Sequence, residues 1–154
     1  MMLAQVPRRL LLLAAVGCLA FMATGCSPAQ QVVGTWDLDS SKPIPTEFFD
    51  ANPLVGAMLA MGKPDFQVTM QGDGAFHLKA KVGPVTQEKK GSWRFVKTEG
   101  KTLLLMVKEA GKTEETELRF TPLDAEHADL SMPLDLGGQK INPAFSFIKA
   151  KPGV

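Results

Sequence analysis

Alternating apolar and polar residues dominate the chain from about residue 32 onward, which is the spacing of β-strands that bury one face. Phe66, Val68 and Met70 alternate with polar neighbours, and Phe76 and Leu78 continue the alternation after a Gly-Asp-Gly turn. Similar segments follow as far as Lys151 and are separated by short connections. The 14 glycines and 11 prolines favour frequent turns over long helices. The pattern predicts an all-β domain of about eight antiparallel strands.

The large apolar side chains expected on one face determine how such a sheet must be arranged. An open sheet would leave half of them in water, and one short helical segment cannot cover eight strands. Closure into a barrel buries all of them and removes the sheet edges. We therefore expect an antiparallel up-and-down eight-stranded barrel. The side chains expected inside it are Trp36, Phe66, Met70, Phe76, Leu78, Trp93, Phe95, Leu118, Phe120, Leu130, Phe145 and Phe147.

One helical stretch is expected, between the first two strands. The first strand is predicted over Val32–Asp39, and one or two helical turns over Pro45–Ala51. Asn52 is a suitable helix cap and Pro53 a suitable first helical residue, so a second short helix is predicted there. Gly62 is expected to end this helix.

The two short helices should enclose several large apolar side chains: Phe48, Phe49, Leu54, Met58 and Met61. One interpretation is a plug that closes the barrel mouth. The other is a mobile lid over an entry for apolar molecules, formed by Phe48, Phe49, Met58 and Met61, since methionine surfaces adapt to varied partners.

The first 26 residues have the features of a secretory signal peptide. Arg8 and Arg9 precede the apolar run Leu10–Ala23, and small residues lead to Cys26. The run of about 14 residues is shorter than the roughly 20 that a membrane-spanning helix needs. We therefore predict that residues 1–25 are removed.

The small residues before Cys26 resemble the lipobox of bacterial lipoproteins, in which the cysteine is acylated. Gly25 fits that pattern, whereas Ala23 stands where Leu, Val or Ile is usual. Cys18 is a competing site, but cleavage there would leave Leu19–Ala23 on the mature protein. The resemblance implies an acylated Cys26, and two or more acyl chains give stable membrane anchoring.

The resemblance also predicts the organisation of the mature chain. Residues 26–31 are the lipidated cysteine and a short tether, and residues 32–154 are the barrel domain. Five extended tether residues reach roughly 17 Å, so the domain should lie close to the lipid headgroups. Ser27 replaces the Asp that marks inner-membrane retention, which implies the outer membrane of a Gram-negative bacterium.

The net charge argues against a nucleic-acid partner, and the cysteine content argues against a disulfide. Loss of Arg8 and Arg9 leaves 15 of the 17 basic residues against 16 acidic ones, a net charge of −1. No basic patch remains, so we expect no nucleic-acid partner. The single remaining cysteine, Cys26, is used by lipidation, so the core must hold the fold without a disulfide.

The G-x-W sequence in Gly34–Asp37 resembles that of lipocalins and the related fatty-acid-binding proteins. The two short helices and the Gly-Asp turn after them extend the resemblance to about Gly74, and Gly91–Trp93 is similar to small bacterial lipocalin-like lipoproteins. The resemblance implies that Trp36 closes one end of the barrel. A basic side chain of the last strand, Lys149 or Lys151, should pack across its ring.

The resemblance also bears on the ligand. Fatty-acid-binding proteins hold a carboxylate with an arginine and a tyrosine near the end of the chain. This sequence has no tyrosine, and Arg119 is expected to point outward. A buried carboxylate without a partner is costly, so an ionised fatty acid is disfavoured as a ligand.

Residues typical of catalysis or metal binding are not arranged for either. His77 and His127 are expected on the outer face, so we predict no metal site and no cofactor. Glu114, Glu115 and Glu117 are interpreted as a solvated strand end. We expect the protein not to be an enzyme.

Two functions remain open. The first is a membrane-tethered module that binds a small apolar molecule inside the barrel. The alternative is a protein-interaction or inhibitory lipoprotein with a filled core, acting through its rim or through Leu104 and Met106. These two side chains are expected to point outward, where either a loop or helix covers them or they form a contact patch. The side chains expected to contact an apolar ligand are Trp36, Phe76, Trp93, Phe95, Phe120 and Phe145.

Overall fold

The computed structural model describes residues 27–50, 53–136 and 139–151. The predicted signal peptide, both cysteines and the proposed helix cap Asn52 lie outside the described residues.

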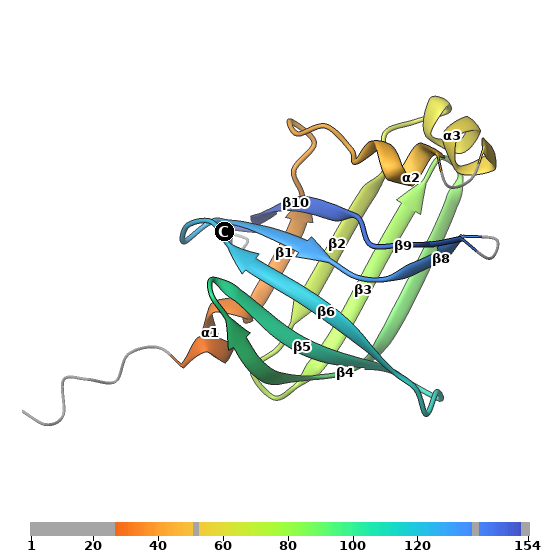
Figure 1. Ribbon diagram of the computed structural model, residues 1–154. Helices are drawn as coiled ribbons and strands as arrows, with labels where there is room; N and C mark the ends of the chain where they lie inside the picture. The colour runs from red at the N-terminus through yellow and green to blue at the C-terminus, as the bar shows by residue number, and fades with distance from the viewer. Residues whose placement is uncertain (1–26, 51–52, 137–138, 152–154) are drawn as a thin grey trace, which may run out of the picture.

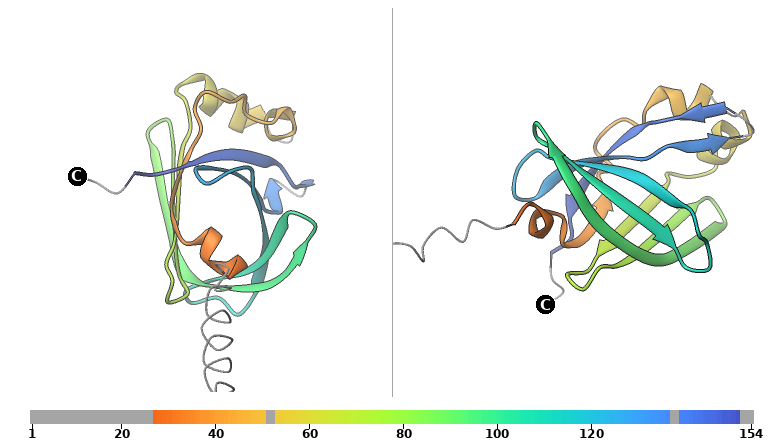
Figure 2. Two further views of the ribbon diagram at one scale, coloured as in Figure 1. Left: turned by 90° about the vertical axis from the view of Figure 1, so that its left-hand side faces the viewer. Right: turned by 60° about the horizontal axis from the view of Figure 1, so that its bottom comes forward.

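Eight strands form a closed antiparallel barrel, as the sequence predicts, and Figure 2 (left) shows them as a ring. Each strand pairs with its neighbour in the chain, except that β10 pairs with β7 on one side and closes the barrel against β1 on the other. The barrel strands are β1 (Gly34–Leu38), β2 (Asp65–Met70), β3 (Ala75–Val82), β4 (Val85–Glu99), β5 (Thr102–Glu109), β6 (Glu115–Pro122), β7 (His127–Ser131) and β10 (Ala144–Lys149).

Short helices lie at the two ends of the barrel (Figure 1). Helix α1 (Pro28–Val32) precedes β1 and lies at one end, which we call the α1 end. Helices α2 (Thr46–Asp50) and α3 (Pro53–Ala60) connect β1 to β2 and lie at the opposite end, which we call the α2–α3 end. The predicted pair of helices between the first two strands is confirmed.

Helix α1 corrects the predicted start of the first strand. Val32 was expected to begin that strand, but it ends a helix, and β1 begins at Gly34. Pro28 at the first helical position favours this helix. The side chain of Val32 is fully buried, and its carbonyl accepts a 2.9 Å hydrogen bond from Nε1 of Trp36. The segment expected to be an extended tether is thus largely part of the folded domain.

A second correction concerns the stretch between β7 and β10. It forms a two-stranded hairpin, β8 (Leu134–Leu136) with β9 (Gln139–Ile141), which the sequence analysis did not predict. Leu134, Leu136 and Ile141 supply the alternation typical of a short hairpin.

One core of buried apolar residues fills the barrel from the α1 end as far as Phe145. Trp36 is 1 % exposed and Phe120 is fully buried, and their rings meet edge to face with centroids 5.0 Å apart. Aromatic pairs in this geometry stabilise beyond their buried area. The other buried apolar residues of this core are Val32, Val68, Met70, Phe76, Trp93, Leu103, Leu105, Val107, Leu118, Ala128, Leu130, Phe145 and Phe147.

Strand β4 is long because it pairs with two neighbours in succession. Its first half pairs with β3 as far as Ser92, and from Gly91 onward it pairs with β5. A Cβ atom at Gly91 would lie 1.9 Å from the carbonyl oxygen of Lys108, so this close approach requires glycine. Beside the end of the β4–β5 ladder, Lys89 forms a 3.6 Å ion pair with Glu109.

The contact patch that the alternative function would place at Leu104 is not present, because Leu104 is covered. Leu104 does not face the core, yet only 4 % of it is exposed. Its cross-strand neighbours are Lys97 and Arg119, which pair with Glu99 at 2.6 Å and with Glu117 at 2.8 Å. We attribute the burial of Leu104 to the apolar stems of these two cross-strand neighbours, because long charged side chains cover apolar surface in this way.

Candidate ligand site at the α2–α3 end

The α1 end of the barrel is closed by Trp36 and the side chain that crosses it. The Nζ atom of Lys149 lies 5.3 Å from the centroid of the Trp36 ring, which confirms the predicted cation–π contact. Gly34 makes room for this crossing, since a Cβ atom there would lie 2.8 Å from Cε of Lys149.

Most of the six aromatic side chains expected to contact a ligand pack into the core instead of lining one cavity. Trp36 and Phe120 contact each other. Phe76 is 5 % exposed and lies opposite Met70 in the β2–β3 ladder. The barrel layer that contains these rings is filled by side chains.

Trp93 and Phe95 occupy positions on β4. Nε1 of Trp93 donates a 2.9 Å hydrogen bond to the carbonyl of Gln71, and Trp93 borders a surface hollow that Ala29 of α1 also lines. Phe95 is half-buried against the core. Neither residue lines the cavity that Phe145, the last of the six, lines.

Phe145 is at the opposite end, at the start of β10. Its ring meets Phe66 of β2 edge to face, with centroids 5.6 Å apart. This pair joins β2 to β10, and Phe145 also lines the candidate site.

Exposure along the inner wall rises toward the α2–α3 end. Opposite each other in the β2–β3 ladder, Met70 is 1 % and Phe76 5 % exposed. One step along, Val68 is 4 % exposed and its partner Leu78 is half-buried, and a step further Phe66 and Ala80 are both half-buried. Apolar side chains on the β2–β3 part of the inner wall are therefore least well covered where the barrel nears α2 and α3.

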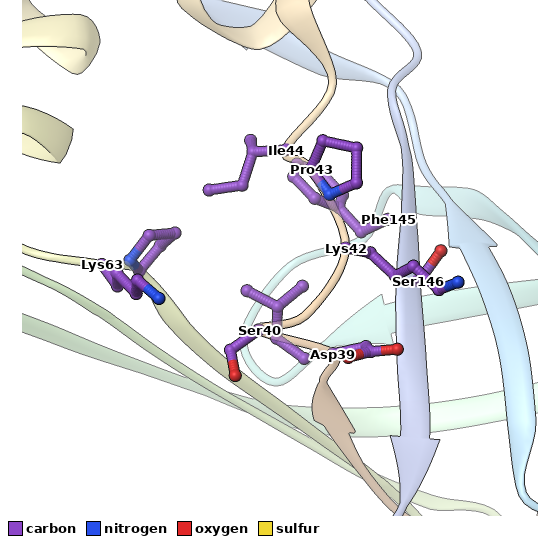
Figure 3. A pocket seen from close by; sticks show the side chains of 10 residues that line it. Asp39, Ser40, Lys42, Pro43, Ile44, Lys63, Phe145 and Ser146 are labelled. Atoms are coloured by element: carbon purple, nitrogen blue, oxygen red, sulfur yellow. The ribbon is translucent and has the colours of Figure 1, made fainter.

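A cavity of about 120 Å³ lies at this end, beneath the loop that follows β1 (Figure 3). Leu38, Ile44 and Phe145 supply apolar walls, and the cavity lies between the loop, the residues just before β2 and the start of β10. The full lining is Leu38, Asp39, Ser40, Lys42, Pro43, Ile44, Lys63, Pro64, Phe145 and Ser146.

Asp39 fixes the loop that covers this cavity. Only 6 % of Asp39 is exposed, and its Oδ1 accepts hydrogen bonds from the hydroxyl of Ser41 at 2.6 Å and from the Ser41 backbone N–H at 2.9 Å. The Ser41 hydroxyl, then its N–H and, more weakly, the charge of Lys42 lower the pKa of this carboxyl below its ordinary value. The Asp39 N–H also donates to the carbonyl of Ser146 at 2.8 Å, which ties the loop to β10.

Two lysines line the same cavity. Lys42 comes from the loop after β1 and Lys63 from the residues just before β2, so they are distant in sequence. Within the described ranges, neither ammonium has a carboxylate within 4.0 Å. No motif in the sequence predicts Asp39, Lys42 or Lys63 as site residues. The Asp-x-Ser turn was the one local signal.

The residues expected to form a lid are described in part. Met61 follows α3 and is 67 % exposed. The side chains of Phe48, Phe49 and Met58 lie outside the described part of the structure. The plug and the lid therefore both remain interpretations from the sequence.

The expected surface histidines and acidic residues lie beside polar partners of opposite type. His77 lies 3.4 Å from Glu88, and Nδ1 of His127 lies 2.9 Å from Asp124. Glu115 binds Arg94 at 2.7 Å. In the described ranges we find no group of three or more His, Cys, Asp or Glu residues that could hold a metal ion. The same ranges contain no helix with the length and apolar character needed to cross a membrane.

Comparison with known proteins gives one informative likeness. No family model matches the chain, and no curated protein matches it. The crystal structure of Treponema pallidum Tp0751 (pallilysin) is similar, with a TM-score of 0.53 over 96 % of this chain and 100 % of that one. Since only 11 % of the residues are identical, the likeness concerns the barrel fold alone.

Proposed function

We propose that the mature protein is a membrane-anchored periplasmic lipoprotein whose lipocalin-like barrel binds a small apolar molecule at the α2–α3 end. The observation that carries this proposal is the rise in exposure of inward-facing side chains along β2 and β3, from Met70 and Phe76 to Phe66 and Ala80. Apolar groups left partly exposed inside a closed barrel gain most from a ligand that removes them from water.

The cavity beside this wall extends the same apolar surface. Phe145 lines the cavity and contacts Phe66, so the two surfaces are continuous. The cavity volume of about 120 Å³ is below the roughly 300 Å³ of a complete ligand pocket. The cavity therefore suits one end of a molecule whose remainder lies against Phe66 and Ala80. This binding role includes no catalytic step.

The helix before β1 supports a close attachment to the membrane. Only Ser27 separates Cys26 from α1, and Val32 at the end of α1 is fully buried. An acylated Cys26 would hold the α1 end of the barrel at the lipid headgroups. The α2–α3 end, which lies opposite in Figure 1, would then face away from the bilayer.

The ligand proposal is tested with a soluble form that begins at Ser27 and with Nile red, a neutral apolar fluorophore. We expect saturable binding with one site per chain. Ala80→Trp should weaken it at least about tenfold, because the larger side chain fills the space beside Phe66. Lys79→Trp introduces the same residue one position away, on the outer face, and should leave the affinity unchanged.

Two results would count against apolar binding in the barrel. One is fluorescence that rises without saturation, and the other is an equal effect of Ala80→Trp and Lys79→Trp. The alternative function, a protein-interaction lipoprotein with a filled core, would then be favoured. It is supported by the nearly complete burial of Trp36, Met70, Leu105 and Phe120.

A further inference from the structure

We infer that the free edge of β4, over Val85–Lys89, binds an extended acidic segment of a partner protein, which pairs with it as an added strand. Closure of the barrel leaves this edge open, because β5 pairs with β4 only from Gly91 onward. The inference goes beyond the proposed function and does not depend on it, since the edge takes a polypeptide and not a small apolar molecule.

The first half of β4 has a neighbouring strand on one side. Val85–Ser92 pairs with β3, and in the described part of the chain no strand pairs with Val85–Lys89 on the other side. Every residue from Val85 to Lys89 is exposed. The turn of the β3–β4 hairpin lies beside Gly62, just after α3, so the edge is at the α2–α3 end of the barrel (Figure 1). An open row of backbone N–H and C=O groups is the usual template for an added strand.

The direction of the backbone groups along this edge follows from one hydrogen bond. The N–H of Ala110 donates to the carbonyl of Lys90 at 2.7 Å, so the backbone groups of Lys90 point away from β3. Backbone groups point to alternate sides along an antiparallel strand, and the β3–β4 ladder has no irregularity. The N–H and C=O groups of Glu88 and Thr86 therefore also point away from β3. Among the described residues they bond to no other backbone group.

The hairpin that presents this edge is basic. From Ala75 to Ser92 it carries four lysines and one glutamate, a net charge of +3 with His77 neutral. The glutamate, Glu88, lies 3.4 Å from His77. Lys79 and Lys81 of β3 have no carboxylate within 4.0 Å among the described residues. A partner segment with acidic side chains is therefore complementary to this edge.

A second copy of this chain is a poorer occupant of the edge. Pairing of two such edges would bring together two hairpins that each carry a net charge of +3, and like charges on adjacent strands destabilise a sheet. Lysines on an exposed strand protect it against such self-association. The charges that keep two copies apart attract an acidic segment.

A labelled peptide tests the inference on the soluble form that begins at Ser27. The peptide Glu-Thr-Val-Glu-Val-Thr-Glu, with fluorescein at its carboxyl end, can pair antiparallel with the edge. Its first glutamate then lies opposite Lys89, and its second lies opposite Thr86, next to Lys81. We expect saturable binding in fluorescence anisotropy, with a Kd on the order of 100 μM. The fully N-methylated peptide keeps the charges but lacks the N–H donors, so it should not bind.

Proline at Glu88 separates main-chain pairing from charge. Glu88→Pro removes an N–H that the β3–β4 ladder does not use, and strands tolerate proline at such edge positions. The matched control Glu88→Ala loses the same carboxylate but keeps the N–H. We expect Glu88→Pro to weaken peptide binding at least about tenfold, and Glu88→Ala to change it less than about twofold. Thr86→Pro and Thr86→Ala repeat the comparison at the next outward N–H, should Glu88→Pro unfold the hairpin.

The charge of the hairpin is tested by a pair of double variants. Lys79→Gln/Lys81→Gln should weaken peptide binding about three- to tenfold, the usual effect of losing partly exposed ion pairs. The matched control, Lys101→Gln/Lys151→Gln, removes two exposed lysines outside the hairpin and should leave the affinity unchanged.

Hydrogen exchange locates the bound peptide without any variant. The peptide should slow exchange of the Thr86 and Glu88 amides, which point away from β3, more than that of Gln87, which points toward β3.

Three results would overturn the inference. Equal binding of the parent and N-methylated peptides would show attraction by charge alone, and equal affinities of Glu88→Pro and Glu88→Ala would exclude pairing at this N–H. A dimer in sedimentation that Glu88→Pro dissociates would assign the edge to a second copy. The proposed function is tested separately, because Glu88 lies on the outer face and Glu88→Pro should leave Nile red binding unchanged.

Discussion

Gly34 lies at the crowded point where the last strand crosses the first. Its φ of +143° is a conformation that side-chain-bearing residues rarely adopt. An added Cβ would also meet Cε of Lys149 at 2.8 Å. The lysine stem can move away, but it would then leave the Trp36 ring. The G-x-W sequence therefore requires glycine at this position for two reasons. One is the backbone conformation, and the other is the space that the cation–π contact needs.

Gly34→Ala should accordingly destabilise the protein by about 1–3 kcal/mol, the usual cost of a strained backbone. Urea unfolding of the soluble form measures this change. Gly72→Ala is the matched control, because a Cβ there has no atom within 4 Å and the residue does not have a positive φ. Equal free energies of unfolding for the two variants would contradict this explanation of Gly34.

Asp39 predicts a dependence of stability on pH. The hydroxyl and N–H of Ser41 and the charge of Lys42 lower its pKa in the folded state. Its unfolded pKa is about 3.9, so the ionised carboxylate stabilises the fold above that pH. This contribution is lost as the pH falls through the lower, folded-state pKa.

Asp39→Asn should therefore reduce the difference in urea midpoint between pH 7 and pH 3. The exposed Glu114 provides the control Glu114→Gln, which should retain the wild-type difference. If Asp39→Asn shows the full wild-type loss in acid, Asp39 does not stabilise the loop through its charge.

At the scale of single elements, strand β5 is apolar on both faces because both faces are covered. Leu103 and Leu105 pack in the core, while Leu104 is buried beside Lys97 and Arg119. Leu104→Glu should thus destabilise the fold by about 2–4 kcal/mol, because it buries a charge without a partner. Leu123→Glu, at a 59 % exposed position, should change stability by less than about 0.5 kcal/mol. Similar effects at the two positions would show that Leu104 is accessible.

Helix α1 is expected to be part of the folding unit. Val32→Ala should cost about 1–3 kcal/mol, since the removed methyl groups leave a gap in a fully buried site. The exposed Gln31 on the same helix supplies the control Gln31→Ala. If Val32→Ala unfolds at the wild-type urea concentration, α1 is only loosely attached to the barrel.

The elements that the sequence predicts are those fixed by local periodicity. Alternation and turns predict the eight barrel strands, and the number of inward aromatic residues requires closure. The helical state of Pro28–Val32 depends on the burial of Val32 against Trp36, a tertiary contact that no local pattern reports. The burial of Leu104 likewise depends on side chains of β4 and β6.

For the molecule as a whole, the candidate site was the hardest feature to predict. The sequence identifies the apolar residues of the interior but not how completely their rings fill it near Trp36 and Phe120. Asp39 and Lys42 belong to the loop after β1, and they meet Lys63 and Phe145 only when the barrel closes and brings this loop against the start of β10 and the residues before β2. The separation of these three segments along the chain hides the cluster from any motif.

The most direct test of a ligand-binding barrel is native mass spectrometry of the mature protein, extracted from membranes in mild detergent and compared with Ala80→Trp. If the barrel binds a ligand, we expect one small-molecule adduct per chain in the wild type, which organic solvent releases. The fraction of protein that carries this adduct should be strongly reduced in the variant. An unliganded wild-type protein that also fails to take up Nile red would contradict it.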